Sequence, residues 1–225
     1  FIINEDGVEI TYNDFLIQHQ NAKEYYRQII PTIEGFSFSI IADNSPNFLY
    51  SLFALQSLSG AAVNLNPNLS LPELLSRLKM AEVEVLVCGG KIYEQIQEID
   101  SELELKLIFL IDEDVTEFNC KMYAKSSKMD LAATFTEGGN AFIQFTGGSS
   151  GVNKAALISH RNVLSNIDQL QGHFTSFIDL TDLRVLIAFP FYHIFAVVFN
   201  LMFFMNNGGT VILYRELRDL EGVAL

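Results

Sequence analysis

The sequence predicts an α/β protein in which mostly parallel sheet layers are flanked by helices. Short apolar segments rich in Val, Ile and Leu alternate with segments whose apolar residues recur at helical spacing. The connections between them are short, which favours strand–helix–strand units and a parallel sheet. Several of the apolar segments are apolar throughout, as strands buried on both faces are.

Local signals place the individual elements. We expect a first helix with Asn13 as its N-cap, which ends at Pro31, and further helices capped by Ser45 and Ser70. Pro46 follows Ser45 at the first helical position, where a missing N–H costs least. The expected strands are 8–12, 36–42, 61–65, 83–89, 106–112, 141–145 and 155–159. The more polar segment 112–136 is interpreted as a surface excursion.

Composition restricts the classes of function. Hydrophobic residues make up 49% of the 225 residues and charged residues 18%, as in a globular protein. The formal net charge of −13, without a run of Lys and Arg, argues against nucleic acid as a partner. Cys88 and Cys120 form neither a disulfide framework nor a metal-ligand spacing, and Cys88 is expected to be a buried thiol. We predict no metal site.

The segment 185–205 is apolar and long enough for a membrane span by hydropathy alone. Pro190 and His193 interrupt it, and the turn-forming residues 206–209 follow. We therefore expect a strand at 185–189, a loop and a buried helix, and keep an integral membrane protein as an alternative. The chain opens at Phe1 with acidic residues nearby, which is not the pattern of a secretory signal. We interpret this start as a cut within a longer protein.

The segment most informative about chemistry is 141–170. An apolar strand leads into the loop Thr146–Lys154, which is followed by a second strand and by a helix that starts near His160 or Arg161. Glycines allow backbone N–H groups to approach an anion, hydroxyls add donors, and Lys154 adds a compact positive charge. The expected phosphate-binding residues are Thr146, Gly147, Gly148, Ser149, Ser150, Gly151 and Lys154. The spacing is not that of a Walker A loop, and a Gly/Ser hairpin without a ligand is the alternative.

This segment, FIQFTGGSSGVNKAALISHRNV, resembles the signature loop of the adenylate-forming enzymes, which usually reads close to YTSGTTGLPKGVMLTHRN. Three further segments resemble that family in the right order: EITYNDF, the region from DNSPNF to NLNPNLSLPEL, and IAFPFYHIFAVVFNLMFFMNNGGTVIL. Gly147 stands where the family usually has serine, and Asn153 where it usually has proline. These two departures put full catalytic competence in doubt.

The resemblance implies ATP-dependent activation of a carboxylic acid, fatty or aryl, through an acyl-adenylate, with Mg²⁺ and with coenzyme A as the thiol acceptor. His193 and Phe195 match family positions beside the acyl pocket, whereas a core histidine bonded to backbone is the alternative for His193. The chain would be the front part of the large N-terminal domain, residues 1–225, without the small C-terminal domain. The catalytic lysine is expected beyond Leu225, so we predict that the fragment alone forms no adenylate. A degenerate, non-catalytic relative is the alternative. The resemblance implies an intracellular protein, cytoplasmic or peroxisomal.

Overall fold

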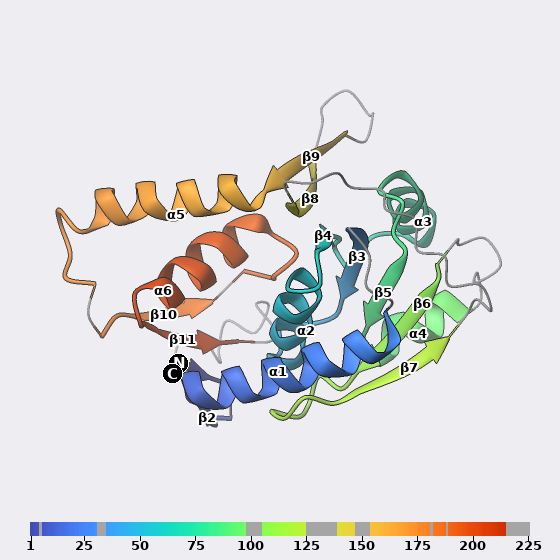
Figure 1. The fold of residues 1–225 in the computed structure, drawn as a ribbon, viewed down its shortest axis with the longest axis horizontal. Coiled ribbons are helices and arrows are strands. Elements are labelled where there is room, and N and C mark those ends of the chain that lie inside the picture. The colour runs from blue at the N-terminus through green and yellow to red at the C-terminus, as the bar shows by residue number, and fades with distance from the viewer. Residues whose placement is uncertain are drawn as a thin grey trace.

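The computed structural model describes residues 1–4, 6–30, 35–97, 105–124, 139–146, 154–180, 182–187 and 189–214. Its strands form two sheets. The larger sheet has seven strands in the order β7-β6-β5-β3-β4-β8-β9, and the smaller has four in the order β10-β11-β1-β2. Helices cover both sheets (Figure 1). This confirms the predicted α/β class with mostly parallel sheet layers.

The centre of the larger sheet is parallel. Its parallel strands are β3 (Phe36–Ile41), β4 (Gly60–Asn64), β5 (Val85–Cys88), β6 (Leu107–Ile111) and β8 (Asn140–Thr146). The antiparallel strands β7 (Cys120–Ala124) and β9 (Lys154–Ser159) close its two edges. The carboxyl ends of the five parallel strands therefore meet at one edge of the sheet, which is where α/β proteins usually bind ligands.

Helices lie on both faces of the larger sheet (Figure 1). The helices α1 (Tyr12–Ile29) and α2 (Pro46–Gln56) share one apolar core with the smaller sheet, whereas α3 (Leu71–Met80) and α4 (Gly90–Gln97) belong to a second core. Ser45 caps α2 by accepting from the Phe48 N–H, and Pro46 is its first residue, both as predicted. The first residue of β4, Gly60, leaves no room for a side chain, because a Cβ there would lie 2.9 Å from the Leu55 carbonyl oxygen.

The smaller sheet combines the two ends of the described chain. The strands β10 (Arg184–Ile187), β11 (Thr210–Leu213) and β1 (Ile2–Ile3) are parallel, and β2 (Glu9–Ile10) pairs antiparallel with β1. Above it lie α5 (His160–Phe174), the π-helix η2 (Ala196–Phe203) and the short α6 (Phe204–Asn206) (Figure 1). The buried helix expected after 185–189 is therefore present, with most of its length in the wider π form.

One expectation about local structure is wrong, and another is incomplete. The first helix begins at Tyr12, because the Thr11 hydroxyl and the Asp14 side chain form a capping box that places the N-cap before Asn13. The first part of the expected surface excursion, 112–124, does lie at the surface, but it adds a strand to the sheet that the sequence did not predict. It contains the edge strand β7, and the buried Asn47 donates to the carbonyls of Val115 and Glu117. Residues 125–138 lie outside the described part of the chain.

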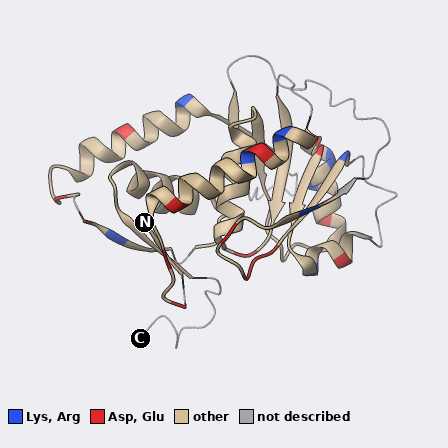
Figure 2. Cartoon of the chain, turned by 60° about the horizontal axis from the view of Figure 1, so that its bottom comes forward, with Lys and Arg blue, Asp and Glu red and all other residues tan. Residues whose placement is uncertain are grey.

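Charged residues are scattered over the described elements in Figure 2, and four acidic residues lie within the loop between β6 and β7: Asp112, Glu113, Asp114 and Glu117. Among the described residues, no helix is both long and apolar enough to cross a bilayer. The membrane span considered for 185–205 is replaced by β10, a loop and η2.

Both cysteines are free thiols. Cys88 is fully buried, as predicted, and burial raises the pKa of its thiol to about 12. Burial likewise raises the pKa of Cys120 to about 12.

We therefore expect slow alkylation of both thiols by iodoacetamide at pH 7, because only the thiolate reacts and almost none forms. Both pKa values lie above the ordinary value of 9.0, so folding favours the protonated thiols. Their contribution to stability is complete below about pH 9 and is lost as the pH rises toward 12. Mass spectrometry of native and urea-unfolded protein tests this, and equally fast labelling in both states would contradict it.

Candidate active site

The predicted phosphate-binding loop connects β8 to β9 at the carboxyl edge of the larger sheet. Thr146 and Lys154 face each other as the last antiparallel pair of these strands, and the Thr146 hydroxyl donates to the Lys154 carbonyl at 3.3 Å. Both residues are exposed. The structure therefore brings together the two ends of the predicted loop. Gly147, Gly148, Ser149, Ser150 and Gly151 lie outside the described residues.

The strands beneath the loop are joined by side chains as well as by backbone. The Asn64 side chain, at the carboxyl end of β4, donates to the Gln144 side chain on β8 at 3.0 Å. On the other side of the loop, Ser159 caps α5 by accepting from the Asn162 N–H, so the helix begins at His160 as expected. The base of the loop is thus fixed between a sheet and a capped helix.

The second predicted group, His193 and Phe195, lies in the turn before η2. The His193 N–H donates to the Pro190 carbonyl at 3.0 Å, and the Ala196 N–H donates to the His193 carbonyl at 2.9 Å. Both side chains are exposed, Phe195 by 52%. The alternative of a core histidine for His193 is therefore wrong, because its side chain faces solvent.

Aromatic rings extend from Phe195 into the protein. Phe195 stacks on Phe199 with ring centroids 5.0 Å apart, and Phe199 stacks on Phe203 at 5.7 Å. Phe174 of α5 contacts the last two of these rings, each at 5.6 Å. Phe203 is 1% exposed, so the row runs from solvent to the core. The three phenylalanines, Phe195 just before η2 and Phe199 and Phe203 on it, recur at a spacing of four residues, and this spacing was the sequence signal for the row.

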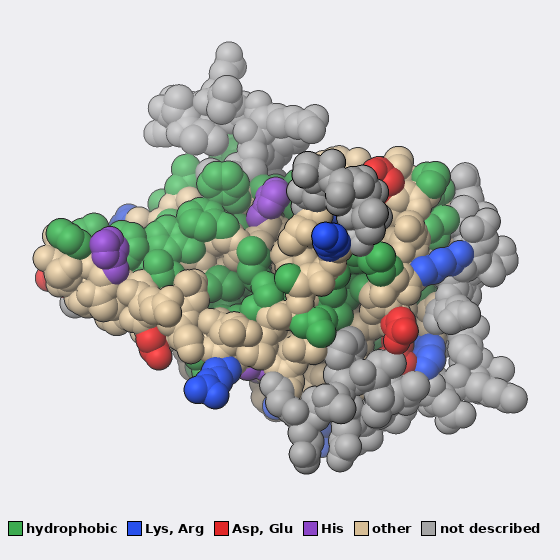
Figure 3. Space-filling model, turned by 90° about the horizontal axis from the view of Figure 1, so that it is seen from above, with side chains coloured by type: hydrophobic (Ala, Val, Ile, Leu, Met, Phe, Trp, Pro, Cys, Tyr) green, Lys and Arg blue, Asp and Glu red, His purple; other side chains and the backbone are tan. Residues whose placement is uncertain are grey.

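Apolar side chains also gather on the outer surface of this part of the molecule (Figure 3). The exposed ones on β9, on α5 and just after it are Leu157, Leu164, Phe177 and Ile178, which are 46–75% exposed. The row of rings thus lies beside a surface that is itself apolar.

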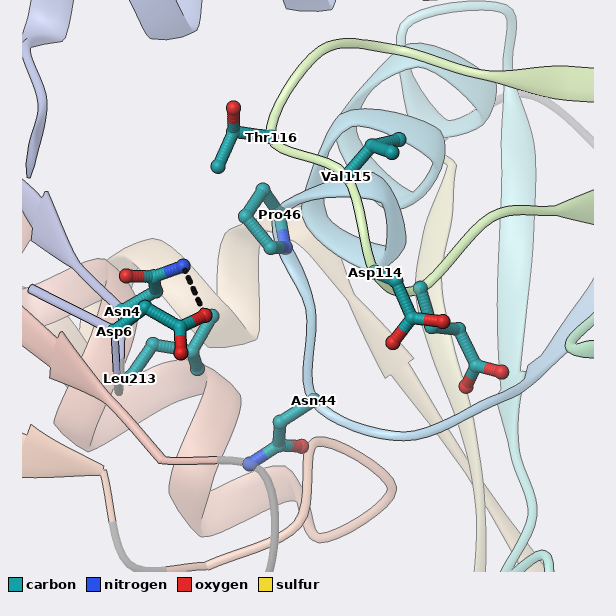
Figure 4. A pocket seen from close by; sticks show the side chains of 9 residues that line it. Asn4, Asp6, Asn44, Pro46, Asp114, Val115, Thr116 and Leu213 are labelled. Atoms are coloured by element: carbon teal, nitrogen blue, oxygen red, sulfur yellow. Dashed lines mark hydrogen bonds between the residues drawn. The ribbon is translucent and has the colours of Figure 1, made fainter. Parts of the chain in front are cut away.

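A separate hollow lies at the carboxyl ends of β1, β3, β6 and β11 (Figure 4). It is a small hollow open to solvent, and its lining residues are Asn4, Asp6, Asn44, Pro46, Glu113, Asp114, Val115, Thr116 and Leu213. The carboxylates of Asp6, Glu113 and Asp114 make this lining unsuitable for a phosphate. Thr146, Lys154, His193 and Phe195 do not line it. Within the described ranges, no group of three or more His, Cys, Asp or Glu residues is placed to hold a metal ion.

The two sheets, the helices between them and the loop at the carboxyl edge define an α/β protein of the class that binds ligands at the ends of parallel strands. The chain belongs to the family of AMP-binding enzymes, whose family model matches residues 7–224.

Individual relatives agree with this assignment. The chain is 39% identical to a long-chain-fatty-acid–CoA ligase of Salmonella typhimurium over 83 residues. This matched segment is 37% of this chain and 15% of the relative. It is 22% identical to 4-coumarate–CoA ligase 3 of Arabidopsis thaliana over 96% of this chain and 39% of the relative. The chain thus spans less than half the length of these relatives.

Solved structures share the fold. Apo MatB from Rhodopseudomonas palustris superposes with a TM-score of 0.74 at 17% identity, over 94% of this chain and 41% of that one. The N-terminal domain of FACL13 from Mycobacterium tuberculosis superposes with a TM-score of 0.72 at 19% identity, over 94% of this chain and 52% of that one. The fold is that of the N-terminal domain of adenylate-forming enzymes.

Proposed function

We propose that the protein activates a carboxylic acid with ATP. The carboxylate attacks the α-phosphorus of ATP and the bond to the β-phosphate oxygen breaks, which yields an acyl-adenylate and pyrophosphate. The thiol of coenzyme A then attacks the acyl carbon, so that a thioester forms and AMP leaves. Family membership and the ligases among its relatives support this proposal.

The observation that carries the proposal is the pairing of Thr146 with Lys154 at the two ends of a Gly- and Ser-containing loop on the carboxyl edge. In the proposal, Thr146, Gly147, Gly148, Ser149, Ser150, Gly151 and Lys154 bind the β- and γ-phosphates. Backbone N–H groups and one ammonium group stabilise the charge that develops on the departing pyrophosphate. Mg²⁺ enters with ATP as the counter-ion of its phosphates.

For the acid we propose an apolar acyl group that lies beside His193 and Phe195. The row Phe195, Phe199 and Phe203 supports this, because it offers ring surfaces from solvent to the core. A fatty acid fits an extended row of rings better than a small polar acid does. The similarity to a long-chain-fatty-acid–CoA ligase supports the same choice.

We further propose that residues 1–225 form the front part of the N-terminal domain. In this view the adenine-binding motif and the catalytic lysine lie beyond Leu225, in an intracellular protein. The competing proposal is a non-catalytic relative, which the replacements at Gly147 and Asn153 favour.

Acid-dependent exchange of labelled pyrophosphate into ATP tests the proposed reaction. We expect no exchange with residues 1–225 alone. With a chain that continues through the adenine motif and the catalytic lysine, we expect exchange that depends on palmitate more strongly than on 4-coumarate. Exchange by the 225-residue chain would contradict the proposed division of the site. No exchange by the longer chain with either acid would favour the non-catalytic relative.

A further inference from the structure

Asn44 joins parts of the chain that are far apart in sequence. It lies in the turn between β3 and α2, is 6% exposed, and also borders the hollow in Figure 4. Its Nδ2 donates to the carbonyls of Phe189 at 3.2 Å and Tyr214 at 3.4 Å, and its Oδ1 accepts from the Phe191 N–H at 2.9 Å. A single side chain thus satisfies three backbone groups that lie 145 to 170 residues further along the chain.

These bonds connect the two sheets. Asn44 follows β3 of the larger sheet, whereas Tyr214 follows β11 and Phe189 lies just beyond β10 of the smaller sheet. Packing supports the same connection, because the ring of Phe191, 1% exposed, lies 5.2 Å from the ring of Phe48 on α2.

The bonded segment leads directly to the proposed acyl site. Asn44 hydrogen-bonds to the backbone of Phe189 and Phe191. The carbonyl of Pro190, which lies between them, accepts from the His193 N–H. The His193 carbonyl in turn accepts from the N–H of Ala196, the first residue of η2. Asn44 is therefore connected to His193 through its own hydrogen bonds, the covalent backbone of residues 189–191 and the bond from the His193 N–H to the Pro190 carbonyl. The bond from the Ala196 N–H to the His193 carbonyl continues this connection to the π-helix.

We propose that Asn44 is a positioning residue that sets where His193 and Phe195 lie. The effect of Asn44 on substrate binding rests on the proposed function. Its effect on the position of His193 does not depend on that function. Only a side chain with a donor and an acceptor on one short stem satisfies all three backbone groups. Aspartate in place of Asn44 still accepts from the Phe191 N–H. Its second carboxylate oxygen cannot donate to the carbonyls of Phe189 and Tyr214, so those two bonds are lost.

Asn47, in the first turn of α2, provides a matched control. It is also a buried asparagine with three backbone partners, since it donates to the carbonyls of Val115 and Glu117 and accepts from the Asn119 N–H. Its partners belong to the loop between β6 and β7, not to the segment that holds His193. Loss of either asparagine removes three side-chain hydrogen bonds to backbone groups, so both variants are expected to unfold at lower urea concentration.

The test compares Asn44→Ala, Asn44→Asp and Asn47→Ala in the 225-residue chain by histidine-ring ¹H–¹³C NMR. The His193 signal is assigned as the one missing in His193→Gln, and the signal of His19 is the internal reference. We expect both Asn44 variants to move or broaden the His193 signal, while Asn47→Ala leaves it in place. Should Asn44→Ala not fold, Asn44→Asp, which keeps one of the three bonds, decides the outcome.

A second measurement connects the position to function. We expect the dissociation constant of a fluorescent fatty acid to rise about fivefold or more in Asn44→Asp, as for the loss of one net hydrogen bond, with the pyrophosphate affinity unchanged. An unmoved His193 signal in the Asn44 variants, or an equal movement in Asn47→Ala, overturns the proposal. A moved His193 signal without any fatty-acid binding by the unmodified chain supports the positioning role and counts against the proposed substrate.

Discussion

Replacement of Lys154 by glutamine is expected to weaken pyrophosphate binding by about 10- to 150-fold. A hydrogen bond to a charged group contributes about 1.5–3 kcal/mol, which corresponds to this range of dissociation constants. Lys154 is exposed at the first position of β9, directly opposite Thr146, so its loss removes the ammonium group at the mouth of the loop without disturbing a core. Isothermal titration of the 225-residue chain with magnesium pyrophosphate at low salt measures the effect.

Lys121→Gln is the matched control for that experiment. Lys121 is also an exposed lysine on an edge strand, but it lies on β7, at the opposite end of the seven-stranded sheet from β9. Its replacement changes the net charge of −13 by the same amount. Equal weakening by both variants would show that net charge, and not the loop, determines binding.

The second large effect is expected at Tyr26 of α1. Its side chain is fully buried, its ring centroid lies 4.9 Å from that of Phe109, and its hydroxyl bonds to the Ser51 hydroxyl at 2.8 Å. Tyr26→Ala removes both the packing and the hydrogen bond, and we expect the free energy of unfolding to fall by about 3–5 kcal/mol. Tyr26→Phe keeps the ring, so we expect a fall of only about 1–3 kcal/mol from the unpaired Ser51 hydroxyl.

Urea denaturation followed by circular dichroism measures these changes. Leu16→Ala, a truncation of a 62% exposed side chain on the same helix, is the control and is expected to change the free energy of unfolding by less than about 0.5 kcal/mol. A Tyr26→Ala variant as stable as the Leu16→Ala variant would contradict the position of α1 against the larger sheet.

The sequence predicted those parts of the fold that local chemistry determines. Ser45 with Pro46, and the continuous apolar runs of β3, β5 and β6, were sufficient to place their elements. The strand β7 was missed because it is short, contains Lys121 and lies in a polar segment, so it lacks the continuous apolar run of the central strands; an edge strand is buried on fewer sides and does not need such a run. The helical pattern alone did not determine whether Thr11 or Asn13 is the N-cap, because both are polar residues near the start of the helix.

The candidate site was predicted less completely, for a physical reason. The loop from Thr146 to Lys154 is contiguous in sequence, so its residues could be identified together. Asn44 could not be connected with Phe191, because 147 residues separate them and a single asparagine carries no periodic signal. The row of rings from Phe195 to Phe203 did not stand out in the sequence, because the segment around it is apolar at almost every position and the four-residue spacing is hidden among other apolar residues.

The proposed polyphosphate site consists of Lys154 and of backbone N–H groups that the glycines of the loop leave accessible, at the carboxyl edge of an acidic protein. Titration of the ¹⁵N-labelled chain with magnesium pyrophosphate, followed by amide NMR, shows whether these N–H groups bind it. We predict saturable shifts that are largest for the N–H groups of residues 146–154. Shifts centred elsewhere, or none at pyrophosphate concentrations that saturate other nucleotide-binding loops, would contradict this proposal.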